Sequence, residues 1–333
     1  CSGGGSHREG APQTLNPCPP PNTSPSSAGP HWTYEGPHGQ QHWPEGHPAC
    51  GGRSQSPIDI GTGRALPDPS LPPLRPIGYN RPPAAPFGLA NNGHTAVLAL
   101  PPSLRLGGLP HSFAAAQLHF HWGRNGGAEH LLDGYRAPAE LHVVHYDAER
   151  FANASQAQHH AAGLAVLGVL LEAGDEPNPA YDNILRHLGS IRYAGQATSI
   201  PSFSLRGLLP QRLDRYYRYN GSLTTPPCFQ SVLWSVFQQP VLLSRAQLRG
   251  SLYATAPDEP EPERLEENFR APQDLNQRLV LASFSSGEGD GVGRGGGTHT
   301  VVSISPRGSA RSRQQQDVVF KASSRRTPEH HRP

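Results

Sequence analysis

The 333-residue chain lacks methionine entirely, even at position 1, and it lacks a long apolar run. Because a complete translation product begins with methionine, we expect a processed chain or a fragment from which a signal peptide is already missing. The longest apolar stretch, residues 161–171, is too short to cross a bilayer, so we expect no membrane span in this chain. The formal net charge of +2 gives no reason to expect nucleic acid or an acidic membrane as a partner.

Cysteine is also scarce, with four in the whole chain. Cys1 and Cys18 lie in low-complexity sequence, whereas Cys50 and Cys228 lie far apart in segments of more structured composition. A long-range pair of this kind is typical of an oxidising compartment, although two unpaired thiols remain a fair alternative from sequence alone. Three glycosylation sequons point the same way; they begin at Asn22, Asn153 and Asn220. We therefore expect a secreted or lumenal protein.

Glycine and proline, 37 residues each, concentrate at the two ends of the chain and leave one region that can hold a core. Residues 1–30 are rich in Gly, Ser and Pro, and we expect them to be disordered. Residues 31–285 are expected to form one folded domain. Residues 286–333 begin as a Gly-rich linker and continue as a basic tail without apolar periodicity, which we also expect to be disordered.

Short apolar runs bounded by Gly and Pro indicate a β-rich domain. Strands are predicted at residues 95–100, 115–121, 140–146, 164–171 and 231–237. Helical patterns are few, and they lie at residues 181–188, 205–209 and 244–253. We therefore predict one mixed α/β domain dominated by a sheet.

Three histidines of two predicted strands are the most informative feature of the chain. His119 and His121 lie two residues apart, so an extended backbone places both imidazoles on one face, and a neighbouring strand can add His142. Gln117 and Glu140 share that parity, and metal-bound histidines usually donate their second N–H to such oxygens. Three neutral imidazoles leave one corner of a tetrahedron open, which is typical of catalytic zinc.

The competing interpretation is that these histidines are scattered, because the chain contains 18 of them. A lone His-x-His pair would mostly be noise, and the two oxygen-bearing side chains in phase favour a metal site. Imidazole suits zinc, copper, iron or nickel, and the lack of a Cys or carboxylate in phase favours zinc with an open position over a closed structural site. His145 has the opposite parity and is predicted to be a hydrogen-bonded core histidine.

Eight blocks carry a resemblance to a known family: His31-Trp-Thr-Tyr, Gln55-Ser-Pro-Ile-Asp-Ile, Asn91-Asn-Gly-His, Gln117-Leu-His-Phe-His-Trp-Gly, Glu129-His, Ala139-Glu-Leu-His-Val-Val-His, Gly221-Ser-Leu-Thr-Thr-Pro-Pro and Asn268-Phe-Arg. In this order and spacing the chain resembles the α-class carbonic anhydrases over residues 31–284. The resemblance implies a large, mostly antiparallel, twisted central sheet with short peripheral helices.

The resemblance implies reversible hydration of CO₂ to bicarbonate and a proton by attack of zinc-bound hydroxide. It assigns Zn²⁺ to His119, His121 and His142. It places three further residues behind these ligands: Gln117, Glu140 and Asn268. A catalytically silent carbonic-anhydrase-like binding domain is the rival interpretation, but such domains lack one or more of the zinc histidines, and all three are present here.

In front of the ligands, the resemblance implies that the Thr224 hydroxyl donates its proton to Glu129 and thereby orients the hydroxide toward CO₂. Without the other blocks, Thr224-Thr-Pro-Pro would be an ordinary turn. The implied pocket for CO₂ is mainly apolar, because CO₂ is small and nonpolar, although the same residues could be plain core. Its residues are Val144, Leu223, Val232, Trp234 and Thr225.

His94 matches the proton shuttle of the family, since a histidine can accept and release a proton near neutral pH. Taken alone, Asn91-Asn-Gly-His predicts a turn. Tyr34 and Asn92 match polar residues that support a wire of water molecules. Val97 departs from the family, which commonly has a polar residue there, so we expect some change in the proton-transfer rate without loss of activity.

Within the family the chain is most similar to the membrane-anchored extracellular isozymes. This implies a Cys50–Cys228 disulfide, a place at the outer face of the plasma membrane, inhibition by sulfonamides and anions, and association with a bicarbonate transporter. Those isozymes carry a transmembrane helix after the catalytic domain. Here a Gly-rich linker leads directly to Gln316-Asp-Val-Val-Phe, so the anchor is expected to be skipped.

Overall fold

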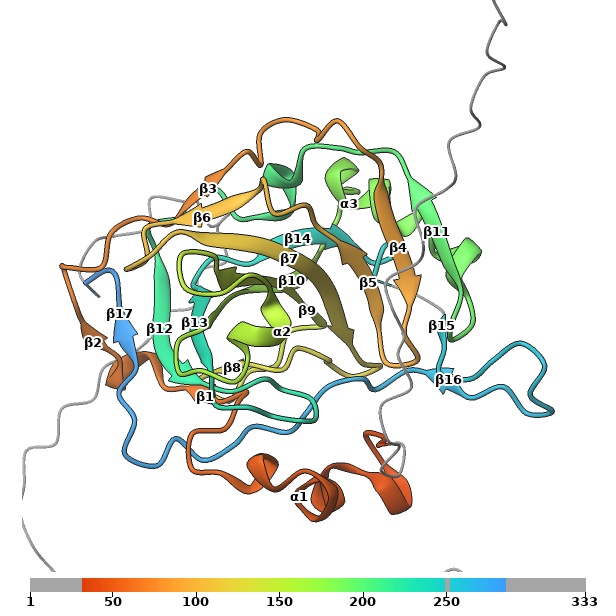
Figure 1. The fold of residues 1–333 in the computed structure, drawn as a ribbon, viewed down its shortest axis with the longest axis horizontal. Coiled ribbons are helices and arrows are strands. Elements are labelled where there is room, and N and C mark those ends of the chain that lie inside the picture. Colours follow the sequence, from red (N-terminus) through yellow and green to blue (C-terminus); the bar gives the residue numbers. More distant parts are fainter. Residues whose placement is uncertain (1–31, 249–251, 286–333) are drawn as a thin grey trace, which may run out of the picture. The chain divides into compact units, whose positions relative to one another are not determined.

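The structure is a computed structural model that describes residues 32–248 and 252–285. The segments predicted to be disordered, together with Cys1, Cys18 and Asn22, lie outside these residues. The described chain is built on a 13-stranded sheet in which β11, β4, β5, β7, β9, β10, β13, β12, β17 and β2 are neighbours in that order, while β14 pairs with β10 and β6 joins β3 to β7. Figure 1 shows that the strands curve and twist across the molecule.

The strands of this sheet are β2 (Leu66–Pro67), β3 (Arg75–Ile77), β4 (Phe87–Asn91), β5 (Ala96–Ala99), β6 (Arg105–Gly107), β7 (Phe113–Trp122), β9 (Ala139–Asp147), β10 (Leu164–Gly174), β11 (Ala197–Ile200), β12 (Tyr216–Gly221), β13 (Val232–Phe237), β14 (Val241–Ser244) and β17 (Leu281–Ala282). Two small sheets pair β1 (Asp59–Ile60) with β8 (Leu131–Leu132) and β15 (Leu252–Tyr253) with β16 (Arg264–Leu265).

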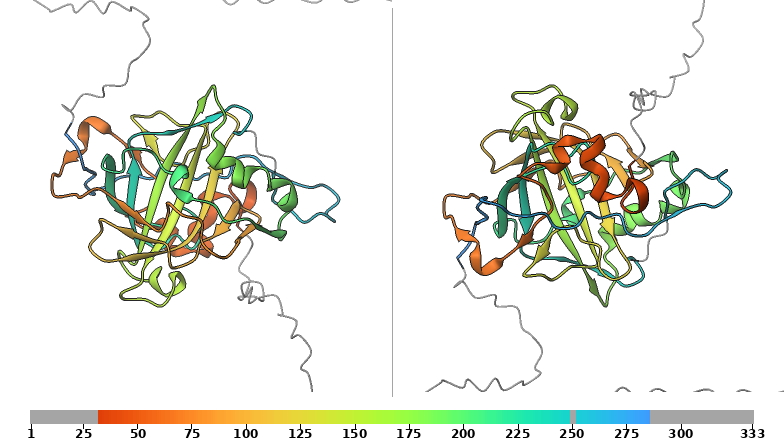
Figure 2. Two further views of the ribbon diagram at one scale, coloured as in Figure 1. Left: turned by 90° about the horizontal axis from the view of Figure 1, so that it is seen from above. Right: turned by 90° about the horizontal axis from the view of Figure 1, so that it is seen from below.

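The helices are short and peripheral. The α-helices are α1 (Trp43–Gly46), α2 (Ala154–Ala157) and α3 (Pro179–Leu185); the 3-10 helices are η1 (Gly36–His38), η2 (Gln40–His42), η3 (Pro48–Gly51), η4 (Thr62–Arg64), η5 (Leu188–Ile191) and η6 (Leu205–Leu208). Across the described ranges, none of these helices has the length and apolar character needed to cross a membrane. Figure 1 shows the red segment with α1 below the central strands, and the view from below in Figure 2 shows it lying across them. The predicted fold class is confirmed, and most strand pairs, including β7 with β9, are antiparallel.

The central strands β7 and β9 separate two apolar clusters. Leu118, Leu141 and Val143 pack into the larger cluster, and all three are at most 1% exposed. Val144, two residues beyond His142, packs into the smaller cluster with Val166 and Trp234. Burying a side chain of this size contributes about 1.5–3 kcal/mol, so these alternating contacts fix which face of each strand points to which cluster.

One predicted helix, at residues 244–253, is wrong. The chain leaves β14 at Ser244, and the Ser244 hydroxyl accepts a hydrogen bond from the Gln247 backbone N–H, which closes a single turn. Leu252 then pairs with Leu265 in the antiparallel pair β15–β16. The apolar residues of the predicted helix therefore belong to a turn, which contains Ala246 and Leu248, and to the strand β15.

Candidate metal centre and active site

The three histidines predicted as ligands come together on one face of β7 and β9. His119 lies directly opposite His142 in the antiparallel register, and His121 follows on the same face of β7. One ring nitrogen from each residue lies within 4.8 Å of the others. The geometry therefore fits a metal site with three imidazole donors.

Hydrogen bonds leave one nitrogen of each ring facing inward. His119 Nδ1 bonds Gln117 Oε1 at 2.8 Å, and His121 Nδ1 bonds the Asn268 backbone oxygen at 2.7 Å. His142 uses its other nitrogen, Nε2, which bonds Glu140 Oε1 at 2.8 Å. Because each partner is an oxygen that can only accept, each of these nitrogens donates, and the remaining nitrogen of a neutral ring keeps a lone pair. His121 Nε2 is buried and has no hydrogen-bond partner among the described residues.

Burial keeps the His119 and His121 rings neutral. It lowers the pKa of His119 well below its ordinary value, and the neighbouring His121 and His142 rings lower it further. Burial likewise lowers the pKa of His121, although the nearby Glu129 carboxylate opposes the shift. Neutral imidazole is the form that binds metal, so these shifts favour ligation at neutral pH.

Glu140 fixes His142 from behind and is itself held by a buried network. Its Oε1 accepts from His130 Nδ1 at 2.8 Å, and its Oε2 accepts the backbone N–H groups of Glu129 and His130. Burial disfavours the charged form, but the His130 and His142 rings hold the pKa of Glu140 well below its usual range. Gly168 lies opposite His142 on β10, and a Cβ there would come within 2.9 Å of Glu140 Oε1. The carboxylate therefore needs a glycine at this position.

Glu129 lies beside the ligand rings and is fully buried. Its Oε1 accepts the Arg270 backbone N–H at 2.8 Å and lies 3.5 Å from His121 Nδ1. Its Oε2 lies 3.9 Å from His142 Nδ1 and has no hydrogen-bond partner within the described ranges. Thr224 is 5% exposed and forms no hydrogen bond with Glu129 in this structure. Glu129 Oε2 is thus an acceptor still available to a donor.

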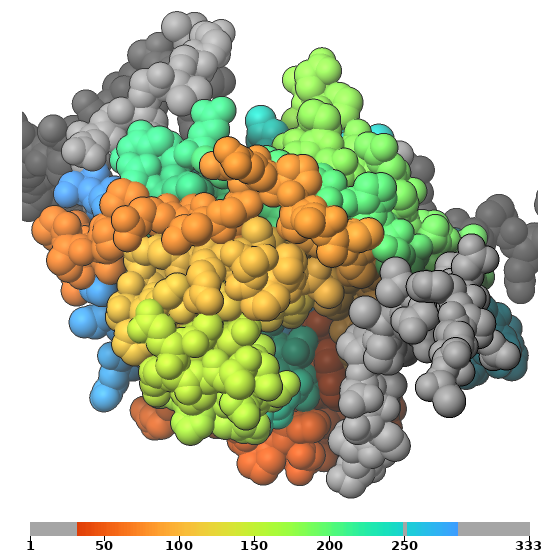
Figure 3. Space-filling model, turned by 45° about the horizontal axis from the view of Figure 1, so that its top comes forward, coloured from red at the N-terminus to blue at the C-terminus, as the bar shows by residue number. Residues whose placement is uncertain are grey.

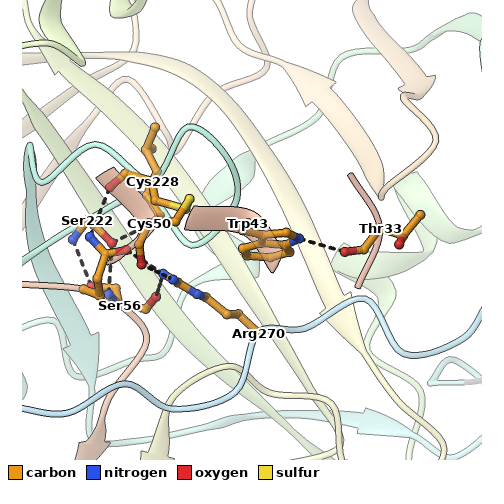
Figure 4. Close-up of a disulfide and its surroundings, with 9 residues drawn as sticks. Thr33, Trp43, Cys50, Ser56, Ser222, Cys228 and Arg270 are labelled. Carbon is orange, nitrogen blue, oxygen red and sulfur yellow. Dashed lines mark hydrogen bonds between the residues drawn. A yellow bond between two sulfur atoms is a disulfide. The ribbon is translucent and has the colours of Figure 1, made fainter. Parts of the chain in front are cut away.

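The loop that carries Thr224 is fastened to the N-terminal segment by the Cys50–Cys228 disulfide, which confirms the predicted pair. Figure 4 shows Arg270 beside it, donating to the Cys50 carbonyl at 3.0 Å and the Ser56 carbonyl at 2.9 Å. On the same loop, Ser222 exchanges hydrogen bonds with Ser56. Several independent contacts therefore hold this loop against a segment about 170 residues earlier in the chain.

The predicted apolar wall forms one surface next to His142. Val144, Val232 and Trp234 are at most 7% exposed and belong to the smaller apolar cluster, with Leu223 packed against it. The Trp234 ring lies 4.8 Å from the His142 ring, centroid to centroid. Trp234 also donates its indole N–H to the Ser222 carbonyl. The ring is therefore held both by this hydrogen bond and by its apolar contacts.

A cavity of about 100 Å³ lies over the site, and it brings together residues predicted for separate roles. Its lining includes Trp32, Tyr34, Asn92, His94, Val97, Gln117, His119, His121 and Thr225. Burial, with a contribution from Glu129, raises the pKa of Tyr34 well above its ordinary value, so its hydroxyl stays protonated.

His94 lies at the mouth of this cavity in a turn and stacks on Trp32, with the ring centroids 3.7 Å apart and the planes 10° from parallel. The side-chain oxygen of Asn92 accepts the backbone N–H groups of His94 and Thr95, and Gly93 takes φ +87°, a conformation that glycine adopts readily. The turn predicted from the residues alone is therefore present, and Asn92 is part of it.

Sequence reasoning gave no role to three residues that the structure places at the site: His130, Arg270 and Trp32. Each lies inside a block that carried the family resemblance, which was the available signal. His145 was predicted to be a core histidine, and this is confirmed: it is fully buried, and its Nε2 accepts the Tyr79 hydroxyl at 2.7 Å.

Comparisons with known proteins match most of the chain. A profile of eukaryotic-type carbonic anhydrases matches residues 38–284. Human carbonic anhydrase 12 is 46% identical over 263 residues, which is 77% of this chain and 74% of that protein. Human carbonic anhydrase 6 is 39% identical over 77% of this chain and 84% of that protein, and mouse carbonic anhydrase 1 is 40% identical over 76% and 98%. From the sequence blocks we expect the chain to be most similar to carbonic anhydrase fourteen and next to carbonic anhydrase twelve. Carbonic anhydrase 12 is among the relatives found.

Proposed function

The chain belongs to the eukaryotic-type carbonic anhydrase family and is an enzyme of that family. We therefore propose that it hydrates CO₂ reversibly at a Zn²⁺ held by His119, His121 and His142. One observation carries the proposal. Each of the three rings donates one N–H to a fixed oxygen. One ring nitrogen of each residue lies within 4.8 Å of those of the other two. Three imidazole donors, with no fourth protein ligand grouped with them in the described part of the chain, suit a catalytic zinc site.

When bound, Zn²⁺ supplies Lewis acidity that makes water a nucleophile near neutral pH, for which carbonic anhydrase is the standard example. The protein's own contribution is orientation. Gln117, Glu140 and the Asn268 carbonyl fix ring tautomers and directions, and partners of this kind typically raise metal affinity 10- to 100-fold.

Thr224 and Glu129 orient the nucleophile. Among the described residues, Glu129 Oε2 is a buried acceptor without a partner, and Thr224 lies on the fastened loop next to Thr225, which lines the cavity. A hydroxyl has one proton, so if Thr224 donates it to Glu129, its oxygen can only accept on the other side. The attacking oxygen then donates to Thr224 and directs its lone pair toward CO₂.

The apolar wall holds CO₂ beside the nucleophile. Val144, Val232 and Trp234 offer no charge to a nonpolar substrate, and Leu223 and Thr225 continue the pocket toward the loop. Weak binding without strong hydrogen bonds permits the product bicarbonate to leave quickly. The dry wall also strengthens the electrostatic interactions at the reacting centre.

His94 exports the proton. Its ring is stacked on Trp32 at the mouth of the cavity, where it can exchange protons with buffer. Tyr34 keeps its hydroxyl proton and can support a chain of water molecules between the ligands and His94. Val97 faces the same cavity without a polar atom, so we expect it to alter the transfer rate without stopping it.

We assign catalysis to a domain of residues 31–285 in an oxidising, extracellular compartment, because the Cys50–Cys228 disulfide ties its active-site loop. Attachment at the outer face of the plasma membrane and association with a bicarbonate transporter belong to this proposal. So does inhibition by sulfonamides and anions, which would take the open ligand position.

Stopped-flow CO₂ hydration tests the proposal, with zinc content measured on the same samples. We expect wild-type protein to bind one zinc and to be sulfonamide-sensitive, and His119→Ala to lose both metal and activity. His38→Ala, which removes an exposed histidine, is the matched control and should behave as wild type. His94→Ala should bind zinc normally, turn over slowly in weak buffer and recover with added imidazole. Wild-type protein without zinc-dependent activity would refute the function.

A further inference from the structure

A groove of about 340 Å³ lies away from the catalytic cavity, along β12, β13 and β17. Arg218 lies opposite Ser235 on β13 and opposite Leu281 on β17, while the next residue on its face, Asn220, lies opposite Leu233. Directly opposed residues share a face of a sheet, so these side chains form one surface. Figure 3 shows the blue C-terminal segment with β17 beside the orange segment that carries β2, at the border of this region.

Arg218 is a buried cation without a countercharge. It is 7% exposed, its Nε donates to Ser235 Oγ at 3.1 Å, and its guanidinium lies 5.0 Å from the centre of the Tyr216 ring. Its Nη2 is buried with no partner, and across the described ranges no carboxylate forms an ion pair with it. Burial lowers the pKa of Arg218, as expected where no anion offsets the loss of water. Leaving a buried charge unpaired is costly, so an anion that reaches this guanidinium would be bound favourably.

Arg278 adds positive charge to the groove, and three of its five N–H groups hold it against the backbone. Its three guanidinium nitrogens donate to the carbonyls of Leu275, Asn220 and Asp274, at 3.0, 3.1 and 2.9 Å. Its guanidinium also lies 5.6 Å from the centre of the Tyr219 ring. Arg278 is therefore anchored to the backbone, whereas Arg218 is the guanidinium of this groove with a buried nitrogen that has no partner among the described residues. A single carboxylate is enough to pair with it.

Apart from Asn220, the remaining walls are mainly apolar. Leu233, Leu279 and Leu281 line the groove, and Leu279 is 64% exposed. Leu66, which pairs with Leu281, continues the apolar surface and is 48% exposed. A purely inorganic anion would leave these walls in water, whereas a ligand with an apolar body would cover them.

We propose that this groove binds a small monocarboxylate with an apolar tail or ring, whose carboxylate pairs with Arg218 and whose body lies on Leu233, Leu279 and Leu281. A guanidinium fork matches the two oxygens of a carboxylate. The volume is in the range of small-molecule sites. This site is separate from CO₂ hydration, and its test does not depend on the proposed catalytic mechanism.

Isothermal titration calorimetry with hexanoate on the metal-loaded full chain tests the site. We expect saturable binding with a Kd of about 1 mM or tighter, at least tenfold weaker binding of neutral hexanamide, and weaker binding of acetate and inorganic phosphate. Arg218→Leu should weaken hexanoate at least tenfold. Leu279→Glu, at a largely exposed position that tolerates a polar side chain, should do the same without affecting the fold. Arg245→Leu, at an exposed arginine, is the matched control.

Carbon dioxide hydration should be unchanged in the Arg218, Leu279 and Arg245 variants, which also shows that each is folded. Equal hexanoate affinity in Arg218→Leu, Leu279→Glu and wild type would overturn the proposal. Binding that survives in both variants but is lost in His119→Ala would place the carboxylate at the metal site instead. Phosphate binding tighter than hexanoate would overturn the carboxylate assignment.

Discussion

His142 and His145 are both buried histidines of β9, yet they lie on opposite faces of the strand and do different work. His142 gives one nitrogen to Glu140 and turns the other toward His119 and His121. His145 uses both nitrogens, one with the Tyr79 hydroxyl and one with the Ala165 carbonyl. A ring whose two nitrogens both form hydrogen bonds, as in His145, has a structural role. A ring with one nitrogen outside any hydrogen bond, as in His142, can serve as a metal ligand.

The same difference runs along both central strands. On β7, Gln117 and His119 face the metal site, while Leu118 between them packs in the larger apolar cluster. Neighbours in sequence thus belong to different environments, and the period of two in a strand is what separates them. Substitutions on the metal face should therefore weaken zinc binding, whereas substitutions on the opposite face should lower the free energy of unfolding.

The largest difference is expected between His142→Ala and His145→Ala. His142→Ala should lose zinc and nearly all CO₂ hydration. Added zinc should no longer raise its free energy of unfolding. His145→Ala should keep one zinc per folded molecule but cost about 2–5 kcal/mol, because it leaves a cavity and an unpaired Tyr79 hydroxyl. Zinc analysis and denaturant unfolding measure both. Full zinc occupancy in His142→Ala would contradict the division.

The next comparison uses the adjacent residues Gln117 and Leu118. Gln117→Ala should weaken zinc binding about 10- to 100-fold, because the His119 ring loses its orienting acceptor. Leu118→Ala should cost about 3–5 kcal/mol of unfolding free energy with zinc affinity retained. Competition with a chelator measures the first effect and urea unfolding of the metal-free protein measures the second. Equal zinc affinities in the two variants would show that the faces are not independent.

The smallest effect is the part of the pH dependence of stability that comes from His145. Burial lowers the pKa of His145 to about 4, below the value of about 6.5 in the unfolded chain. The unfolded state therefore binds the extra proton first as pH falls, so the folded state loses stability between pH 6.5 and 4. The loss amounts to about 3 kcal/mol at the acid end.

His145→Phe should remove this slope, and urea unfolding at several pH values measures it. Wild-type protein and the Arg245→Leu variant should keep it. If the slope is the same in His145→Phe, the acid sensitivity comes from other groups.

The metal face could be predicted because it depends on local parity. Gln117, His119 and His121 occupy one face of a strand whatever the rest of the chain does, and the alignment of His119 with His142 follows once β7 and β9 pair. The bulge between Ala115 and Gln117 does not disturb this, because it lies before the histidines. Local periodicity also explains the failure at residues 244–253, where the apolar residues of a turn and of one short strand had a helical spacing.

Contacts from distant segments could not be derived from spacing. Asn268 came from the family resemblance, but sequence does not say that its backbone oxygen serves His121 while its side chain bonds Trp122 and His94. The stacking of Trp32 on His94 likewise depends on where the N-terminal segment lies. Such contacts are set by tertiary packing, which no local pattern encodes.

The clasp made by Asn268 and Arg270 has a consequence for how the protein is made. Asn268 reaches His121 across 147 residues, and Arg270 reaches Cys50 across 220. Contacts between residues so far apart form slowly, because the intervening chain must first be brought to order. The ribosome must release almost the whole domain before the last oxygen behind the metal ligands is in place. Capture of the proposed zinc would therefore be a late step in folding, and it would report that the chain has closed correctly.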